Sequence, residues 1–422
     1  MEKALFETPE SPPESREIAS ANASVANSQP RKWPRRLFSA CVAAAAISGA
    51  WVSVEKWKAS RFEQACAEAR KQRDWRTLRK VAREWIQWDP GSSKGWWRAA
   101  EAAQKLEDLE DMAECLGNIS PEDPKYAFAL AEKANLEWTA LNRPLDALKT
   151  SETAITIDPR LLEVHSRIIS FYAMTLQRVP MLRAARRAMS QHAEPKETYA
   201  YVIVADNLTF SNAIDINGRW LSACPDEPMF KVGLGVQTAM NVMLKEASSR
   251  NDDVVIASRE AQSQIQWFLD ALPGNPVLLA FLLHQAYQKG DVSRVAQLLQ
   301  QVSDDGAQDH MIWVYRGWYH TQSREYEEAE KSFLEARRLH PISPLAWHEH
   351  AQLLRAMQNP DAEKTQRLAA YGRELRSQVL QLSSAAEITP ALMLQVQSYA
   401  ATCGDEVIAN AAANRLRNLS IQ

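Results

Sequence analysis

The 422-residue sequence lacks the cysteine spacing of metal sites and disulfide frameworks. Its five cysteines are odd in number, widely scattered and never arranged as CxxC: Cys41, Cys66, Cys115, Cys224 and Cys403. We interpret them as small, buried apolar residues, with a disulfide or a reactive thiol as the less favoured reading. No metal site is predicted.

The sequence also lacks the short motifs that mark common catalytic sites. GxxxxGK[ST], GxSxG and HExxH do not occur, and Gly233 and Gly235 lack the third glycine of a dinucleotide-binding loop. His348 and His350 are close in sequence, but a spacing of two points side chains to nearly opposite sides of a helix. We therefore predict no catalytic residue, no cofactor-binding residue and no enzymatic activity.

Charge of one sign and glycine are scarce as well. The formal net charge is -3, which gives no global basic field for nucleic acid, so we predict no nucleic-acid partner. Only 13 glycines occur in the chain, and this composition suits a helix-rich array better than a sheet-rich enzyme.

The first part of the chain predicts a tail followed by a membrane anchor. Residues 1–36 are rich in Ser, Pro, Glu and Ala and end in a basic flank, which is typical of a disordered tail. Residues 37–54 contain no charge over 18 positions, the lower limit for a transmembrane helix, so we expect a lipid bilayer as one partner. A cleaved signal peptide, an export signal containing Arg35 and Arg36, and a buried helix are the alternatives.

The orientation of this anchor follows from its basic flanks. Four Lys and Arg residues precede the span within 31–36 and three follow it within 56–61, which favours a cytoplasmic N-terminus. We therefore expect a single-pass membrane protein with its large C-terminal part outside the cytoplasm, in the periplasm if the protein is bacterial.

The stretch 310–343 has the clearest pattern in the chain. Its apolar and small residues at i, i+4 and i+7 share one helix face, and a proline ends the helix. The positions that define the pattern are Trp313, Gly317, Ala329, Phe333, Ala336 and Pro341. This spacing resembles the tetratricopeptide repeat, a helix-turn-helix unit of about 34 residues that buries its apolar face only against neighbouring units.

The offset of twelve residues between an alanine and a proline recurs along the chain. It joins Ala147 to Pro159, Ala213 to Pro225 and Ala261 to Pro273, as it joins Ala329 to Pro341. We predict about nine units over 59–422, irregular at 196–260, where an inserted element is the alternative. The resemblance implies an all-α, right-handed solenoid with a concave groove.

The predicted function is that of a membrane-anchored scaffold whose groove binds a peptide or helix of a partner protein. In the family the contacts come from the first helix of each pair, so the resemblance implies Asn135, Arg316 and His320 as groove residues. Arg183, Arg186 and Arg187 share a helix face that suits acidic groups of a partner. The alternatives are a self-associating component of the cell envelope, hence a homo-oligomer, and an enzyme within the irregular central region.

Overall fold

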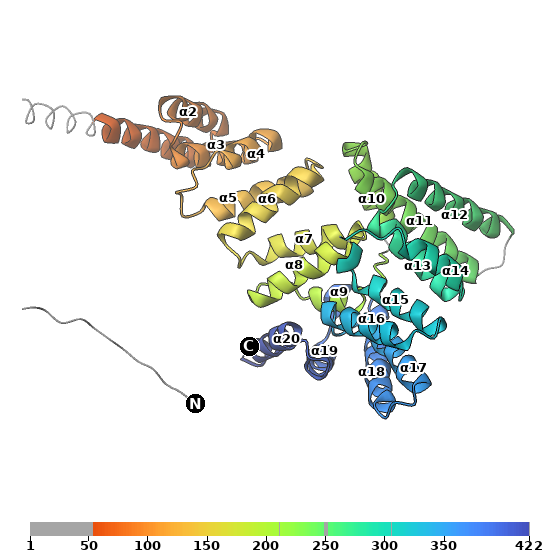
Figure 1. The fold of residues 1–422 in the computed structure, drawn as a ribbon. Helices are drawn as coiled ribbons and strands as arrows, with labels where there is room; N and C mark the ends of the chain where they lie inside the picture. Colours follow the sequence, from red (N-terminus) through yellow and green to blue (C-terminus); the bar gives the residue numbers. More distant parts are fainter. Residues whose placement is uncertain (1–53, 211, 249–251, 305, 422) are drawn as a thin grey trace, which may run out of the picture. The chain divides into compact units, whose positions relative to one another are not determined.

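The computed structural model describes residues 54–210, 212–248, 252–304 and 306–421. Secondary structure in these ranges is helical throughout, which confirms the predicted all-α class (Figure 1). The chain divides into two compact units, 1–63 and 64–422. Helical residues 54–63 are the described part of the first unit, and the second unit begins with helical residues 64–71.

The second unit continues as a succession of helices of mostly 13 or 14 residues. They are α2 (Trp75–Trp88), α3 (Ser93–Lys105), α4 (Leu109–Gly117), α5 (Tyr126–Trp138), α6 (Pro144–Ile157), α7 (Leu162–Met174), α8 (Arg178–Ser190), α9 (Thr198–Ile203), α10 (Ala213–Ala223), α11 (Pro228–Ser248), α12 (Asp252–Ala271), α13 (Pro276–Gln288), α14 (Val292–Leu299), α15 (His310–Gln322), α16 (Tyr326–Leu339), α17 (Pro344–Ala356), α18 (Ala362–Leu380), α19 (Pro390–Cys403) and α20 (Glu406–Ile421). Two 3-10 helices, η1 (Gly306–Gln308) and η2 (Ala385–Glu387), lie between them.

The predicted single-pass membrane location is corrected by the structure. Within the ranges that the structure describes, no helix has both the length and the apolar composition needed to cross a bilayer. The longest helices, α11 and α12, are interrupted by charged residues such as Lys231 and Arg259. The predicted tail and all of the predicted span except Val54 lie outside the described residues.

One tight turn joins the two helices of most pairs. A residue with left-handed backbone, such as Arg73 with φ 56°, ends the first helix, and the N–H of Asp74 then bonds the carbonyl of Ala69 at 2.9 Å. The Asp74 side chain in turn accepts a hydrogen bond from the N–H of Thr77, which caps the second helix. Two residues therefore end one helix and begin the next.

These left-handed residues show the repeat period in the backbone itself. Seven of the ten described residues with left-handed backbone form two series: Arg73, Glu107, Asn142 and Leu176 before the central region, and Gly290, Arg324 and Gln358 after it. Successive members are 34 or 35 residues apart within each group. The period agrees with a helix-turn-helix unit of about 34 residues, whereas the interval from Leu176 to Gly290 contains the irregular helices.

The close packing of α15 against α16 explains why the repeat pattern has a glycine at position 317. A Cβ atom on Gly317 would lie 2.5 Å from the ring of Phe333, so only glycine lets α15 and α16 approach this closely. Ala329, Phe333 and Ala336 are fully buried on the facing side of α16, and Ala147 is fully buried on α6. Pro159, Pro273 and Pro341 each lie just beyond the end of a helix, whereas Ala261 is half-buried within α12.

An indole hydrogen bond fixes the start of several first helices. Trp313 Nε1 donates to the carbonyl of Ala307 at 2.7 Å, and Trp347 Nε1 donates to that of Pro341 at 2.7 Å. The backbone of each linker is thus tied to the helix that follows it.

The central region departs from the repeat at α9. All six of its residues are buried, and it packs against α7, α8, α18 and η2. Side chains such as Tyr199 and Val202 are enclosed on every side, so this β-branched and aromatic stretch is a core helix. The stretch was predicted to be helical, and the structure confirms this, but its burial on every side has no amphipathic signal in the sequence.

The C-terminal helices return to the middle of the second unit. Helix α20 packs against α8, and α18 packs against α9 (Figure 1). Arg376 Nε donates to Asp206 at 2.9 Å and His340 Nε2 lies 3.0 Å from the carbonyl oxygen of Val202, so two further contacts bridge this return. The number of units, the domain boundaries and the handedness of the solenoid stay predictions.

Candidate functional site

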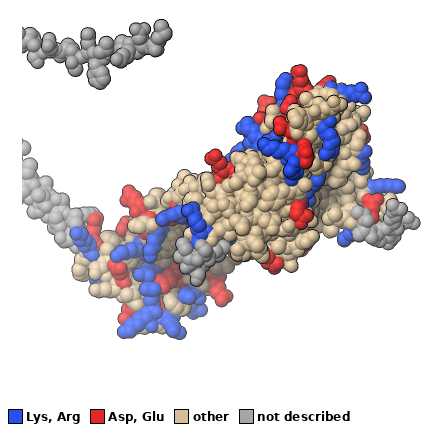
Figure 2. Space-filling view, turned by 90° about the horizontal axis from the view of Figure 1, so that it is seen from below, with Lys and Arg blue, Asp and Glu red and all other residues tan. Residues whose placement is uncertain are grey.

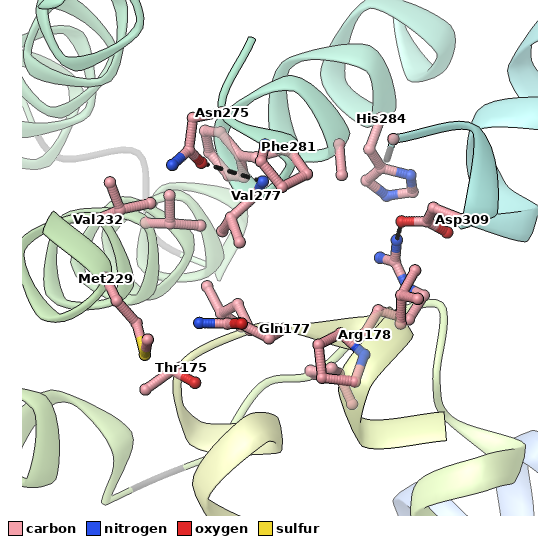
Figure 3. A pocket seen from close by; sticks show the side chains of 18 of the residues that line it. Thr175, Gln177, Arg178, Met229, Val232, Asn275, Val277, Phe281, His284 and Asp309 are labelled. Carbon is pink, nitrogen blue, oxygen red and sulfur yellow. Dashed lines mark hydrogen bonds and ion pairs between the residues drawn. The ribbon is translucent and has the colours of Figure 1, made fainter. Parts of the chain in front are cut away.

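A pocket of about 540 Å³ lies where the irregular helices meet the regular ones (Figure 3). Its walls come from the turn between α7 and α8, the segment 206–208, the start of α11, helix α13 and the end of η1. These segments span more than 130 residues of sequence. The site therefore depends on the way in which the central helices are assembled.

One wall of the pocket is apolar. Val277 and Phe281 project from α13, and Met229 and Val232 project from α11 on the adjoining side (Figure 3). Positions 277, 281 and 284 are spaced i, i+4 and i+7, so they share one face of α13. The opposite face of this helix is buried in the core, which leaves the Phe281 face to line the cavity.

The N-terminus of α13 is fixed at the pocket edge by its own sequence. Asn275 caps the helix, because its side-chain oxygen accepts hydrogen bonds from the N–H groups of Val277 at 3.1 Å and Leu278 at 3.2 Å. Pro276 follows at the first helical position, where its missing N–H is not needed. The cap therefore fixes where α13 begins, and with it the position of Val277 at the edge of the pocket.

The opposite end of the pocket is formed by an ion pair. Arg178 Nη1 and Asp309 Oδ2 are 2.5 Å apart, and the Nε atom of Arg178 donates to the carbonyl of Ala205 at 2.5 Å. Burial opposes the charge of Arg178, but Asp309 raises its pKa above the usual value. Asp309 also caps α15 by accepting from the N–H of Met311, so the pair links the start of α8 to the start of α15.

Two further polar groups of the lining, on His284 and Thr175, are already hydrogen-bonded. His284 Nδ1 lies 3.0 Å from the hydroxyl oxygen of Tyr315, and burial lowers the pKa of His284 so that its ring is neutral. The hydroxyl of Thr175 donates to the carbonyl of Phe171 at 2.8 Å. No nucleophile is hydrogen-bonded to a base among the described lining residues. This arrangement is suited to binding.

Of the six residues predicted to bind a partner, Arg183 lines this pocket. Its side chain is exposed, and it forms no ion pair with any residue that the structure describes. It supplies an available positive charge beside the apolar wall.

The other two arginines of the predicted stripe have carboxylate partners of their own. Arg186 makes a double contact with Asp405 at 2.9 and 2.6 Å, and Arg187 makes one with Glu152 at 2.7 and 3.0 Å. The three arginines share one helix, yet their guanidinium groups have different environments.

The groove residues implied by the resemblance lie on two helices. Asn135 is exposed on α5 and accepts from Arg167 at 3.5 Å. Arg316 lies over the Trp313 ring, 4.6 Å from its centroid, and burial lowers its pKa. His320, one turn further along α15, has Nδ1 2.5 Å from Glu325 Oε2. Their part in binding a partner stays a prediction.

Sequence reasoning missed the apolar wall and the ion pair at the end of the pocket. Nothing near Arg178 in the sequence indicated Asp309, which is 131 residues away. Phe281 belongs to a helix that was predicted as an ordinary repeat helix, and Val232 belongs to the region 196–260 that was predicted to be irregular.

Comparison with known proteins gives a likeness to solved helical-repeat structures only. No family model matches the chain, and no curated protein matches it. A crystal structure of a tetratricopeptide repeat protein from Parabacteroides merdae matches at 12% identity over 58% of this chain and 93% of that one, with a TM-score of 0.26. The Cut9–Hcn1 structure of the APC/C matches at 13% identity over 86% and 87%, with a TM-score of 0.30. Yeast Tom70 matches at 14% identity over 85% and 76%, with a TM-score of 0.28.

Proposed function

We propose that this chain is a helical scaffold that binds a segment of a partner protein, and that one apolar side chain of the segment enters the pocket beside α13. The observation that supports this most directly is the apolar wall of Val277, Phe281, Met229 and Val232 next to polar groups that are already paired. Burying an apolar group against this wall is favourable, because the paired polar groups of Arg178, Asp309 and His284 beside it need no new partner.

The charge at the pocket suggests what stands beside that apolar side chain. Arg183 is exposed and forms no ion pair in the part of the chain that the structure describes, so a carboxylate of the segment can pair with it. A segment with a leucine, methionine or phenylalanine followed closely by aspartate or glutamate fits both features. The apolar residue would supply most of the affinity, and the exposed ion pair would add orientation.

A photo-crosslinking experiment tests this proposal. A benzophenone amino acid in place of Val277, in the full chain, should crosslink one short stretch of one partner protein in an extract of its own cells. The second substitution Ala280→Trp fills the pocket and should abolish this crosslink. The matched control places the benzophenone at Leu334, which is 49% exposed on α16 and lies away from the pocket lining.

The pattern of crosslinks decides the outcome. A stretch that is crosslinked from position 277, absent from position 334 and lost with Ala280→Trp supports the proposal. Crosslinks that are the same from both positions, or that persist when the pocket is filled, contradict it. The alternatives of self-association and of an enzymatic central region stay predictions.

A further inference from the structure

A second hollow lies along the second helices of the first repeats. Helix α4 has nine residues, whereas α2 and α6 have 14 each, so α4 does not fill the space between its neighbours. The resulting trough has a volume of about 960 Å³ and is lined by α2, α4, α5 and α6. A smaller hollow of about 380 Å³ on α2, lined also by Arg76 and Lys80, shares Arg79 and Arg83 with the trough and adjoins its α2 end.

The α2 end of the trough is strongly basic. Arg76, Arg79, Lys80 and Arg83 are spaced i, i+3, i+4 and i+7, so they share one helix face. Arg79 and Arg83 are paired with Asp108 and Asp111, but Arg76 and Lys80 are exposed.

The side chains of Arg76 and Lys80 form no hydrogen bond or ion pair with any residue in the described part of the chain. Figure 2 shows Lys and Arg side chains gathered over these N-terminal helices, at the left of the view. This end of the trough has positive charge that the chain itself does not neutralise.

A buried carboxylate lines the trough on α5. Glu137 is 3% exposed, and its Oε1 atom lies 3.5 Å from Lys133 Nζ. Its Oε2 atom is buried and has no hydrogen-bond partner within the described residues. A buried carboxylate oxygen that accepts no hydrogen bond is costly, so a donor supplied by a ligand would be favourable here.

We propose that the trough is the docking site of an extended segment of a partner protein, with clustered carboxylates against Arg76 and Lys80 and a lysine or arginine that reaches Glu137. This surface is separate from the pocket beside α13, and the inference does not rest on the function proposed there. The segment would place its carboxylates against the positive charges of Arg76 and Lys80, and its lysine or arginine against the negative charge of Glu137.

The acidic residues of α4 distinguish a peptide from a nucleic acid. Glu110, Asp111 and Glu114 line the trough directly beyond the basic end. They pair with Arg143, Arg79 and Arg83, so no row of free positive charge is left there for a continuous run of phosphates. A protein segment can present carboxylates at one end and a positive side chain further on. The alternation of charge along the trough therefore matches a peptide of mixed charge.

The test uses a fluorescein-labelled peptide of six glutamates, a glycine-serine spacer and two lysines, with the full chain and fluorescence anisotropy. The paired substitution Arg76→Glu with Lys80→Glu should weaken binding by about tenfold or more. Lys71→Glu with Arg73→Glu is the matched control, because it changes the net charge equally at exposed residues outside the trough. The control should alter binding by less than about twofold.

Glu137→Gln tests the second contact. The unsubstituted chain should bind the lysine-containing peptide more tightly than one that ends at the spacer, and Glu137→Gln should remove this preference. The proposal is overturned if the peptide does not bind, or if both pairs of charge reversals weaken its binding equally. It is also overturned if a thymidine oligonucleotide binds more tightly than the peptide and Arg76→Glu with Lys80→Glu abolishes that binding.

Discussion

Arg186 and Asp405 are 219 residues apart in the sequence, yet they form a double ion pair with N to O distances of 2.9 and 2.6 Å. Arg186 lies on α8, and Asp405 is the residue before α20. The Asp405 side chain also accepts a hydrogen bond from the N–H of Ile408, in the first turn of α20, at 3.3 Å. The Asp405 side chain is 1% exposed, so the contact belongs to the interior. It is one of the contacts through which the last helix pair is attached to the middle of the second unit.

The substitution Asp405→Asn should therefore destabilise the chain. It removes the charge that Arg186 faces in a buried site, and we expect the free energy of unfolding to fall by roughly 3 kcal/mol. Asp158→Asn is the control, because that carboxylate pairs locally with the exposed Arg160 and should cost less than about 1 kcal/mol. Denaturant unfolding followed by circular dichroism measures both, and equal losses would contradict the structural role of the pair.

Gly317→Ala should destabilise the pair of α15 and α16. The added Cβ would lie 2.5 Å from the Phe333 ring, so the helices must separate, at a cost of about 1–3 kcal/mol. Gly218→Ala is the control, since its Cβ meets nothing within 4 Å inside a helix and the change should stabilise by about 0.5–1 kcal/mol. Thermal unfolding of both variants checks the prediction, and a neutral Gly317→Ala would contradict it.

The helices and their turns were accessible from the sequence because their causes are local. The burial of Ala329 and Phe333 follows from spacing on one helix, and the turn at Arg73 and Asp74 follows from neighbouring residues. The return of α20 to α8 was not accessible, since it depends on residues more than 200 positions apart. Helix α9 lies in the irregular region 196–260, which we predicted to be helical. Its burial on all sides could not be predicted, because the helix shows no periodicity.

The same distinction applies to the sites. The stripe of arginines on α8 was visible from a spacing of three and four residues. Which member is available to a partner depends on carboxylates at 152 and 405, which occupy Arg187 and Arg186 and leave Arg183 at the pocket. The wall formed by Phe281 and Met229 could not be predicted, because α11 and α13 reveal their common cavity only after folding.

Acid should weaken the fold through the buried histidines His310 and His340. Their ring centroids are 4.6 Å apart, and burial lowers the pKa of His340 to about 4 and that of His310 well below its usual value. Arg186 and Arg178 also oppose protonation of His340, whereas Asp405 and the carbonyl of Val202 favour it.

The sign of this pH dependence follows from the lowered pKa. Below about pH 6.5 the unfolded chain binds protons that the folded histidines do not, so stability is complete at neutral pH and falls as the pH drops toward 4. For His340 alone the loss is of the order of 3 kcal/mol. His340→Gln should flatten the decline between pH 6.5 and 4, measured by urea unfolding at several pH values. If the free energy of unfolding of His340→Gln falls with pH as steeply as that of the unsubstituted chain, His340 is not the cause of the decline.

Phe281→Ala should weaken binding of the partner segment identified by crosslinking. Phe281 provides much of the apolar wall, and removing a central aromatic contact from a binding site typically costs about 2 kcal/mol, or roughly 30-fold in affinity. Leu334→Ala is the control, since that side chain is 49% exposed on α16 and should leave the affinity within about twofold. Isothermal titration with the synthetic segment measures both, after circular dichroism has shown that helicity is retained. If Phe281→Ala binds as tightly as Leu334→Ala, the segment does not enter the pocket, because no apolar side chain can fill that site without contacting Phe281.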